Sequence, residues 1–247
     1  MDQRVVFITG GGKGIGAAIA LLAAQRGYAV AINYRNDDAA AECLRDRIET
    51  GGGKVCLVKG DVADVDDVER MIAHAQSVLG SLHALVNSAG ITGPIGKFVQ
   101  SDPAMIERVF RTNVFGTMNC CRAVVRLFQA AGAGGVIINL SSVAATTGSA
   151  NEYVHYAASK AAIDTFTLGL AQELATDGIR VCGVAPGSTL TGIHTLAGEP
   201  ERPARVAPLI PMKRLAQPEE IAEAVLWLMS DAASYVTGST LRCGGGL

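Results

Sequence analysis

Val5-Val6-Phe7-Ile8-Thr9-Gly10-Gly11-Gly12-Lys13-Gly14-Ile15-Gly16 is a short apolar run that opens directly into a glycine-rich loop. The run predicts a buried β-strand over Val5–Thr9, and the alanine-rich residues that follow predict a helix over Ala17–Gln25. Glycines between a strand and a helix let the backbone approach a pyrophosphate, and the helix N-terminus offers N–H groups and a positive dipole end. The stretch therefore predicts a dinucleotide-binding unit, although its spacing is GxxxGxG rather than GxGxxG. A tight turn without a ligand is the alternative.

The same alternation of strand and helix continues along the chain. Further strands are predicted at Val30–Tyr34, Val55–Val58, Ala84–Asn87, Gly135–Ser141, Arg180–Ala185 and Thr240–Cys243. Further helices are predicted at Asp37–Glu49, Val65–Val78, Met105–Ala130, Ala157–Ala175 and Pro218–Ser230. The strands are continuously apolar, which is typical of a sheet covered on both faces. We therefore expect an α/β fold: a single Rossmann-type doubly wound domain over residues 1–247, with a seven-stranded, mostly parallel sheet and helices on both faces.

The composition limits the possible functions. Of the 247 residues, 49% are hydrophobic and 18% are charged, which is typical of a globular chain with a large core. A net charge of −2 argues against binding to nucleic acid or to an anionic membrane. The six cysteines lack zinc-site spacing, so we expect reduced thiols and no metal. The N-terminal residues resemble neither a signal peptide nor a membrane span, and we expect a cytoplasmic protein.

The end of the second predicted strand bears on the choice between NAD and NADP. A carboxylate there would bind the ribose hydroxyls and repel a 2′-phosphate. The chain instead reads Asn33-Tyr34-Arg35-Asn36, and Arg35 can form charge-assisted hydrogen bonds to a phosphate, with Lys13 as a second cation. Asp37 and Asp38 follow closely and weaken this argument, and a solvated Arg35 is the alternative. The sequence favours NADP(H), with NAD(H) as the alternative cofactor.

Asp61 and Val62 follow the third predicted strand. A carboxylate at this place can accept a hydrogen bond from the amino group of an adenine. It can equally cap the helix that begins near Asp64, and from these residues alone we favour the cap.

Tyr156-Ala157-Ala158-Ser159-Lys160 contains the candidate proton donor and acceptor. Residues four apart share one face of a helix, so Tyr156 and Lys160 project to the same side. A phenol has an ordinary pKa of ~10, and a nearby ammonium together with an oxidised nicotinamide favours the phenolate. Tyr156 is therefore suited to general acid–base chemistry on a hydroxyl, although most isolated Tyr/Lys pairs at this spacing only decorate a surface.

Two further polar positions support this interpretation. Ser141 and Ser142 follow the apolar residues Val136–Leu140, where a hydroxyl can polarise a substrate carbonyl. Asn113 interrupts a helical pattern, and because Asn competes for backbone hydrogen bonds we expect a local kink that holds a water. An exposed or capping Asn113 is the alternative.

In this order the motifs resemble the short-chain dehydrogenase/reductase family over nearly the whole chain. They are the TGxxxGxG loop at Thr9–Gly16, Asp61, the Asn-x-Ala-Gly turn at Asn87–Gly90, Asn113, Ser142, the Tyr-x-x-x-Lys pair, and Pro186-Gly187. The 3-oxoacyl reductase-like and glucose dehydrogenase-like members are about equally similar. Three departures stand out: Ser88 replaces a second Asn, Cys243 replaces a common Asp, and Ser142 lies one residue farther from Tyr156 than is usual. The last of these leaves Ser141 as an alternative to Ser142.

The resemblance implies a role for each matching residue. Tyr156 would be the acid/base, and Lys160 would lower its pKa and hold the nicotinamide ribose. Ser142 would orient the substrate oxygen, and Asn113 would support a proton relay through water. The residues expected to bind the cofactor are Gly10, Lys13, Gly14, Ile15, Gly16, Arg35, Asp61, Val62, Asn87, Ala89, Gly90, Tyr156, Lys160, Pro186, Gly187, Thr189 and Thr191. Among them Asp61 would reach the adenine, Asn87 the adenosine side, and Thr191 the carboxamide or the pyrophosphate.

The expected function is that of an NADP(H)-preferring oxidoreductase that interconverts a carbonyl and a secondary alcohol by hydride transfer. An NAD-dependent sugar or alcohol dehydrogenase of the same family and a non-catalytic cofactor-binding sensor are the alternatives. Specificity is expected in Ile91–Val99, Val143–His155 and Ser188–Pro211, whose mixed composition does not identify a small-molecule substrate. Tyr153 lacks a lysine four residues on, and His155 is interpreted as pocket wall or packing. The resemblance also favours a homotetramer, with the apolar excess of the helices around 105–130 and 157–175 at the subunit contacts.

Overall fold

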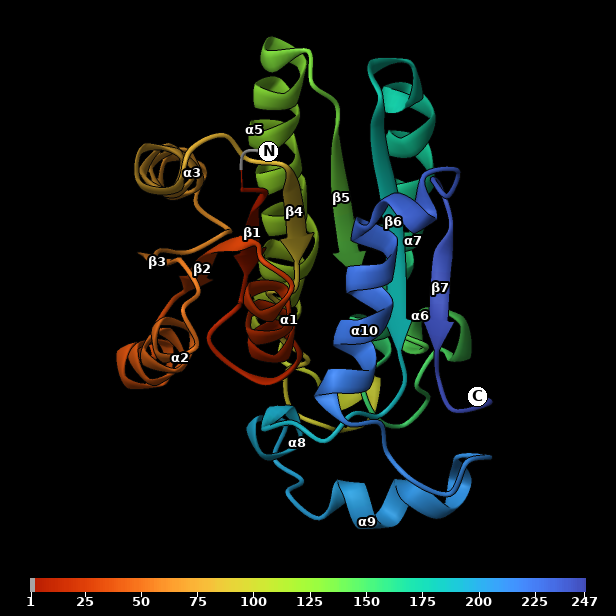
Figure 1. The fold of residues 1–247 in the computed structure, drawn as a ribbon. Coiled ribbons are helices and arrows are strands. Elements are labelled where there is room, and N and C mark those ends of the chain that lie inside the picture. Colours follow the sequence, from red (N-terminus) through yellow and green to blue (C-terminus); the bar gives the residue numbers. More distant parts are fainter. Residues whose placement is uncertain (1–2) are drawn as a thin grey trace.

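The computed structural model describes residues 3–247, which are built around one seven-stranded sheet (Figure 1). The strands are β1 (Val5–Thr9), β2 (Ala29–Tyr34), β3 (Val55–Lys59), β4 (Ala84–Asn87), β5 (Gly135–Leu140), β6 (Ile179–Pro186) and β7 (Thr240–Cys243). Their order is β3-β2-β1-β4-β5-β6-β7, and each neighbouring pair is parallel. The expected doubly wound topology is confirmed, and the sheet of the described residues is wholly rather than mostly parallel.

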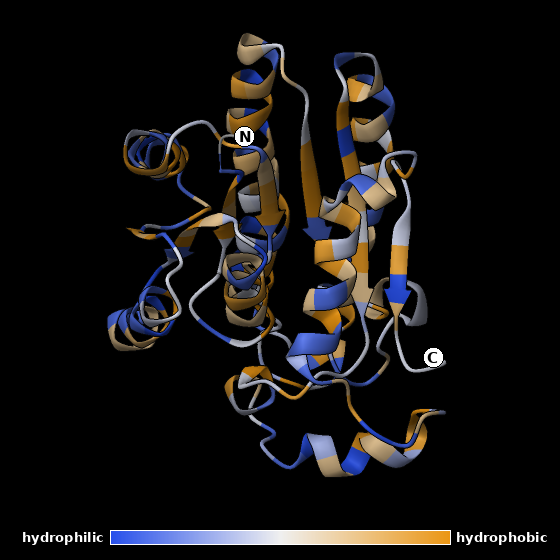
Figure 2. Ribbon diagram, in the orientation of Figure 1, coloured by the Kyte–Doolittle hydropathy of each residue, from blue (hydrophilic) through white to orange (hydrophobic). Residues whose placement is uncertain are grey.

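Helices cover both faces of this sheet. They are α1 (Gly14–Gln25), α2 (Asp38–Thr50) and α10 (Pro218–Met229) on one face, and α3 (Val65–Leu79), α5 (Gly116–Ala131) and α7 (Val154–Leu174) on the other. Alternate residues of β1 enter different cores: Val6 and Ile8 pack with α1 and α10, whereas Val5 and Phe7 pack with α3 and α5. Burial on both faces is the physical reason for the continuously apolar strands, which contrast with the two-sided colouring of the helices in Figure 2.

The helical pattern expected over Met105–Ala130 is broken in the structure. It consists of α4 (Pro103–Phe110), a π-helical turn at Arg111–Phe115, and α5. The break in the helix expected at Asn113 is therefore confirmed, in the form of a widened turn, and the water expected there stays a prediction. The helix α7 begins at Val154, three residues earlier than expected, which places Tyr156 in its first turn.

Three short helices that the sequence pattern did not predict lie around the carboxyl edge of the sheet (Figure 1). They are α6 (Ala144–Thr147), α8 (Ile193–Leu196) and α9 (Arg202–Val206). Because four or five residues make little more than one turn, such helices leave no periodic signal in the sequence.

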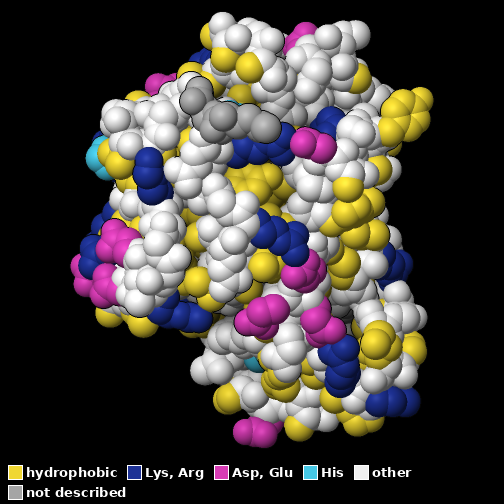
Figure 3. All heavy atoms as spheres, viewed as in Figure 1, with side chains coloured by type: hydrophobic (Ala, Val, Ile, Leu, Met, Phe, Trp, Pro, Cys, Tyr) yellow, Lys and Arg dark blue, Asp and Glu magenta, His cyan; other side chains and the backbone are white. Residues whose placement is uncertain are grey.

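The surface carries charges of both signs. Lys and Arg side chains lie beside Asp and Glu side chains over the face drawn in Figure 3, in keeping with the net charge of −2. No helix within residues 3–247 is long and apolar enough to cross a bilayer.

Candidate active site

A cleft of about 530 Å³ opens at the carboxyl edge of the sheet, where the loops after β1, β4, β5 and β6 meet. It brings together most of the residues expected from the sequence: Gly10, Lys13, Gly14, Ile15, Gly16, Ala89, Gly90, Ser142, Tyr156, Lys160, Pro186, Gly187, Thr189 and Thr191. Five others stand beside or behind the cleft without lining it: Arg35, Asp61, Val62, Asn87 and Asn113.

The glycine loop forms one wall, and its glycines are required by the backbone. Gly10 and Gly14 have φ angles of +59° and +52°, in the left-handed region that favours glycine. A Cβ on Gly16 would lie 2.3 Å from the carbonyl oxygen of Gly10, so no side chain fits there. These glycines keep the N-terminus of α1 open to a ligand.

Hydrogen bonds from two neighbouring strands hold this loop in place. The Thr9 hydroxyl accepts from the amides of Ser88 and Ala89 at 3.0 Å, which ties the loop after β1 to the turn after β4. The Asn33 side chain accepts from the Gly10 amide at 3.2 Å. The glycine loop is thus held by the backbone conformation of its glycines and by hydrogen bonds to the loops and strands on either side.

Tyr156 faces the cleft from the first turn of α7, with the Ser142 hydroxyl opposite. Burial raises the pKa of Tyr156, and a hydrogen bond with Ser142 and the positive charge of Arg202 act in the opposite direction. The neighbouring Ser141 is 3% exposed, and its hydroxyl donates to the backbone oxygen of Lys160 at 3.3 Å. Between the two serines, this geometry favours Ser142 as the hydroxyl that meets a substrate.

Lys160 lies one turn farther along α7, on the same face as Tyr156. Its Nζ is 5.7 Å from the centre of the Tyr156 ring and donates to the backbone oxygen of Leu140 at 2.6 Å. Burial lowers the pKa of Lys160 to about 8, against an opposing effect of Asp164. The ammonium is therefore held next to the phenol, as the spacing of the pair predicted.

Asn113 acts behind the cleft. Its fully buried amide accepts from the Ile91 amide at 2.9 Å and donates to the Ile91 oxygen at 2.9 Å and the Ser159 hydroxyl at 3.0 Å. A Cβ on Gly90 would lie 3.3 Å from the Asn113 Oδ1 and 3.5 Å from the Lys160 Nζ. The widened helical turn thus sets the loop after β4 against the Tyr/Lys pair.

The chain is similar to known oxidoreductases over nearly its whole length. A family model described as enoyl-(acyl carrier protein) reductase matches residues 10–247. An uncharacterized oxidoreductase, YgfF of Escherichia coli strain K12, is 46% identical over 99% of this chain and 100% of its own length. The cis-4-hydroxycyclohexanecarboxylate dehydrogenase of Sinomonas cyclohexanicum is 40% identical over 99% of this chain and 96% of its own. The crystal structure of a dehydrogenase/reductase from Sinorhizobium meliloti 1021 superposes with a TM-score of 0.91 at 33% identity, covering 100% of this chain and 95% of that one.

The chain belongs to the short-chain dehydrogenase/reductase family. It is therefore an NAD(P)-dependent oxidoreductase that acts on CH–OH groups and on the corresponding carbonyls. The resemblance drawn from the ordered motifs is confirmed over essentially the whole chain.

In this short-chain dehydrogenase/reductase the two cations expected near a 2′-phosphate already have carboxylate partners. Arg35 pairs with Asp61 at 3.0 Å, and Lys13 pairs with Asp37. All four side chains are at least one-third exposed, so a phosphate can compete for both cations at small cost.

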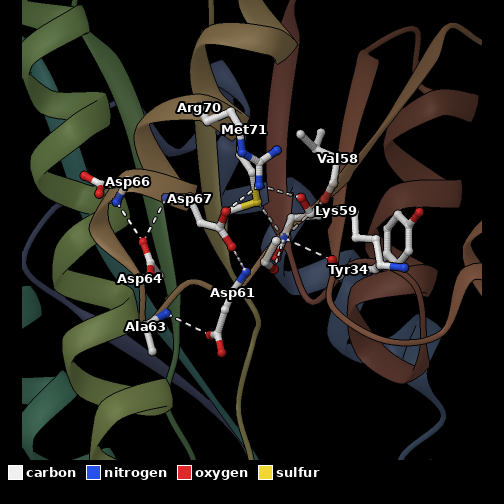
Figure 4. Close-up of polar contacts among 12 residues, drawn as sticks. Tyr34, Val58, Lys59, Asp61, Ala63, Asp64, Asp66, Asp67, Arg70 and Met71 are labelled. Carbon is white, nitrogen blue, oxygen red and sulfur yellow. Dashed lines mark hydrogen bonds and ion pairs between the residues drawn. The ribbon is translucent and has the colours of Figure 1, made fainter.

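The interpretation of Asp61 as a helix cap is wrong. Asp64 directly precedes α3, and its carboxylate accepts from the amides of Asp66 and Asp67 (Figure 4). The Asp61 carboxylate instead accepts from the Ala63 amide at 2.9 Å and meets Arg35. An aspartate that lies immediately before the first helical residue is better placed to cap than one three residues earlier.

Two predicted cofactor residues are buried in the fold. Asn87 ends β4 and donates to the Asn139 side chain of the neighbouring β5 at 2.9 Å, which joins the strands behind the cleft. Val62 is 4% exposed and packs against Gly116. The contact is so close that a Cβ on Gly116 would lie 2.6 Å from the Val62 Cγ2. Neither residue lines the cleft, and a contact of either one with the cofactor stays a prediction.

The far side of the cleft contains an ion pair that the sequence interpretation did not single out. Arg202 from α9 forms an ion pair with Glu152 at 2.6 Å, and its guanidinium lies 5.4 Å from the centre of the Tyr153 ring. Tyr153 in turn meets the Tyr156 ring edge-to-face at 5.3 Å. His155 is buried, does not line the cleft and bonds the Thr92 oxygen at 2.8 Å, which favours packing over pocket wall as its role. No local motif marks Arg202, because its partner Glu152 is 50 residues away.

Proposed function

We propose that this short-chain dehydrogenase/reductase interconverts a carbonyl and a secondary alcohol with a preference for NADP(H), using Tyr156 as the general acid/base. The observation that carries the proposal is the convergence of Ser142, Tyr156 and Lys160 on a cleft whose opposite wall is the glycine loop. A site for nucleotide binding alone has no need of a buried ammonium beside a cleft-facing phenol.

The residues of the glycine wall fit a dinucleotide. Gly10 and Gly14 turn the chain in left-handed conformations, and the absent Cβ of Gly16 leaves the start of α1 open, so the pyrophosphate is assigned to this loop. Thr191 closes the loop from the other side, where a Cβ on Gly14 would lie 3.2 Å from its Cγ2. When bound, the cofactor supplies or accepts the hydride.

The remaining chemistry is assigned to the chain's own side chains. Ser142 holds the substrate oxygen by a hydrogen bond, and Tyr156 gives its phenolic proton to that oxygen in reduction or removes the hydroxyl proton in oxidation. The Lys160 ammonium favours the phenolate of Tyr156 and contacts the ribose. Asn113 keeps the loop after β4 and the lysine in register.

The NADP(H) preference rests on Arg35 and Lys13 and on the lack of a carboxylate at the end of β2. One observation supports the NAD-dependent sugar or alcohol dehydrogenase as a second candidate: Asp61 and Asp37 already neutralise these two cations. The two candidates differ in whether a 2′-phosphate displaces the carboxylates.

Titration of the purified protein with NADPH and with NADH, followed by nicotinamide fluorescence, tests the cofactor assignment. We expect NADPH to bind at least tenfold more tightly, equivalent to about 1.4 kcal/mol. Arg35→Ala removes this difference while NADH binding stays the same. Equal or tighter binding of NADH by the wild-type protein would establish the second candidate.

Replacement Tyr156→Phe tests the acid/base assignment. Carbonyl and alcohol substrates are screened first. The first probe is cis-4-hydroxycyclohexanecarboxylate, because the relative from Sinomonas cyclohexanicum is named as its dehydrogenase. We expect turnover to fall by at least about 100-fold while cofactor binding is retained, since only the proton-transfer group is lost. A variant that turns over as fast as the wild type would refute this role, and a wild-type protein that binds cofactor but oxidises or reduces nothing would support the sensor.

A homotetramer is proposed as the assembly. Apolar side chains are exposed on the helix faces that the sequence assigned to subunit contacts, with Phe115 55% exposed and Leu168 48% exposed. Light scattering coupled to size-exclusion chromatography distinguishes a tetramer of 25.5 kDa subunits from a monomer or dimer.

A further inference from the structure

Glu152 joins the three segments in which substrate specificity was expected. Its backbone oxygen accepts from the Gly96 amide at 2.8 Å, which ties it to the loop after β4. Its carboxylate pairs with Arg202 at 2.6 Å and with Arg205 at 2.7 Å, both from α9. Glu152 lies two residues before α7 and helps to seat the α8–α9 segment (residues 188–211) over the cleft, together with the hydrogen bond from the Ile95 amide to the Ala197 oxygen at 3.0 Å.

Arg202 links this seated segment to the acid/base. Its side chain is 9% exposed, although guanidinium groups are rarely buried, and it faces the Tyr153 ring at 5.4 Å. Tyr153 contacts Tyr156 edge-to-face at 5.3 Å. A continuous contact therefore runs from α9 through Tyr153 to the phenol of Tyr156.

The other charges around Tyr156 do not duplicate this cation. The titratable and charged groups that line the cleft with it are Lys13 before α1, Lys160 on α7, Glu152 and Tyr153 before α7, His194 on α8, and Arg202 and Arg205 on α9. Burial lowers the pKa of Lys160 to about 8, so part of that group is neutral at mildly alkaline pH. Burial also lowers the pKa of His194, which keeps its imidazole neutral near pH 7. The guanidinium of Arg202 stays charged throughout this range and faces the Tyr153 ring, whereas the guanidinium of Arg205 is 47% exposed and is shared between Glu152 and Glu199.

We propose that Arg202 is a positioning residue that couples seating of the α8–α9 segment to the reactivity of Tyr156. With the segment seated, Glu152 holds the guanidinium on Tyr153, the Tyr153 ring buttresses Tyr156, and a permanent positive charge stabilises the Tyr156 phenolate. With the segment displaced, both the buttress and the charge are lost, so Tyr156 is set for proton transfer only over a closed substrate site. The inference rests on the proposed function, because it assumes that Tyr156 is the acid/base.

The ionisation of Tyr156 can be measured without any substrate. Protein labelled with ¹³C at the Cζ of tyrosine has five such positions, and Tyr156→Phe identifies the signal of Tyr156. In the Arg202→Met variant, titrated with and without NADP⁺, we expect the midpoint of the Tyr156 signal to move to higher pH. In Arg202→Lys, which keeps a positive charge, the midpoint moves less. Arg202→Gln serves as a second neutral variant if Arg202→Met does not fold.

Two controls separate the charge of Arg202 from general loosening of the segment. Arg205→Met removes a cation from the same helix and the same Glu152, but its side chain is 47% exposed and is not the one stacked on Tyr153, so the Tyr156 midpoint moves much less than in Arg202→Met. The double variant Glu152→Gln/Arg202→Met leaves no unpaired carboxylate, and the upward shift persists. An unchanged midpoint in Arg202→Met, or an equal shift in Arg205→Met, would overturn the proposal.

Kinetics on a substrate found by the screen provide an independent readout. In Arg202→Met the rise of kcat with pH for alcohol oxidation moves to higher pH, because the phenolate of Tyr156 forms later. A purely structural role would raise KM and leave the pH profile of kcat in place, which would refute the coupling. Failure of the proposed function gives a different result. If Tyr156 is not the acid/base, Tyr156→Phe turns over as fast as the wild type, whether or not Arg202→Met shifts the titration of Tyr156.

Discussion

The two walls of the cleft are built on different physical principles. The cofactor wall is made of backbone: left-handed glycines, a glycine with no room for a Cβ, and the Thr9 hydroxyl bonded to two amides of the adjacent loop. The substrate wall is made of long charged side chains, with Glu152 held between Arg202 and Arg205. A backbone site recognises what all dinucleotides share, whereas a side-chain site can change its chemistry by substitution without disturbing the sheet.

The largest effect is expected from breaking the backbone wall with Gly16→Val. The added Cβ would lie 2.3 Å from the Gly10 oxygen, so the loop has to move away from its binding position. We expect dinucleotide binding to weaken by at least about 100-fold, or ~2.7 kcal/mol, and the free energy of unfolding to fall by about 2–4 kcal/mol. Nicotinamide fluorescence and urea unfolding measure the two quantities.

Gly51→Ala is the matched control for this substitution. Gly51 has an ordinary φ of −77°, and an added Cβ would make only van der Waals contact, at 3.4 Å from the Ile48 oxygen. Stability should change by less than about 0.5 kcal/mol and dinucleotide binding not at all. Equal damage in both variants would show that any added side chain is disruptive, and would remove the special role of Gly16.

The same contrast explains what could be predicted from the sequence. The cofactor wall is encoded within a few consecutive residues, Thr9 to Gly16, because glycine conformation and the start of a helix are local properties. The spacing of Tyr156 and Lys160 is equally local, since one helical turn brings residues four apart together. The break at Asn113 could be expected because one polar residue interrupts an apolar helical pattern.

The substrate wall could not be predicted, because its contacts are distant in sequence. Arg202 and Glu152 are 50 residues apart, and α8 and α9 are too short to show a periodicity. The error at Asp61 has a different cause: the start of the helix at Val65 was predicted correctly, and Asp64, the residue next to it, was therefore the aspartate placed to cap it. One missed element did have a signal, since Asp102-Pro103 is a helix start with a side-chain cap and proline in the first turn.

An intermediate effect, confined to the substrate wall, is expected from Glu152→Gln. The Arg202–Glu152 pair is mostly buried, with side chains 9% and 19% exposed, so breaking it leaves a poorly solvated cation. We expect the free energy of unfolding to fall by about 1–3 kcal/mol and amide exchange to accelerate within α9 (Arg202–Val206), away from Thr189 and Thr191. Dinucleotide affinity should stay within about twofold, and a comparable loss of affinity would contradict the separation of the two walls.

The pH dependence of this pair has a definite sign. Burial raises the pKa of Glu152, but the hydrogen bonds from Arg202 and Arg205 outweigh that effect and hold the pKa below the usual value of 4.5. The stabilisation is therefore complete above pH 4.5 and is lost as the pH falls through the lowered pKa. Unfolding measured between pH 3 and pH 7 should show this acid-side loss in the wild type and a flatter profile in Glu152→Gln.

The smallest effect is expected from Asp61→Asn, which sharpens the comparison within the cofactor wall itself. Asp61 is the partner of Arg35, with side chains 34% and 56% exposed, and exposed pairs of this kind contribute only about 0.2–1 kcal/mol. Freeing Arg35 should therefore raise the ratio of NADPH to NADH affinity by about 1.4- to 5-fold. The ratio is the right measure, because any hydrogen bond from Asp61 to the adenine is common to both cofactors and cancels. Asp38→Asn removes the same charge from a carboxylate paired with Lys59 instead, and it should leave the ratio nearly unchanged. If the affinity ratio rises equally in both variants, the cause is the change in net charge and not the release of Arg35. If it rises in neither, Arg35 does not contact the 2′-phosphate.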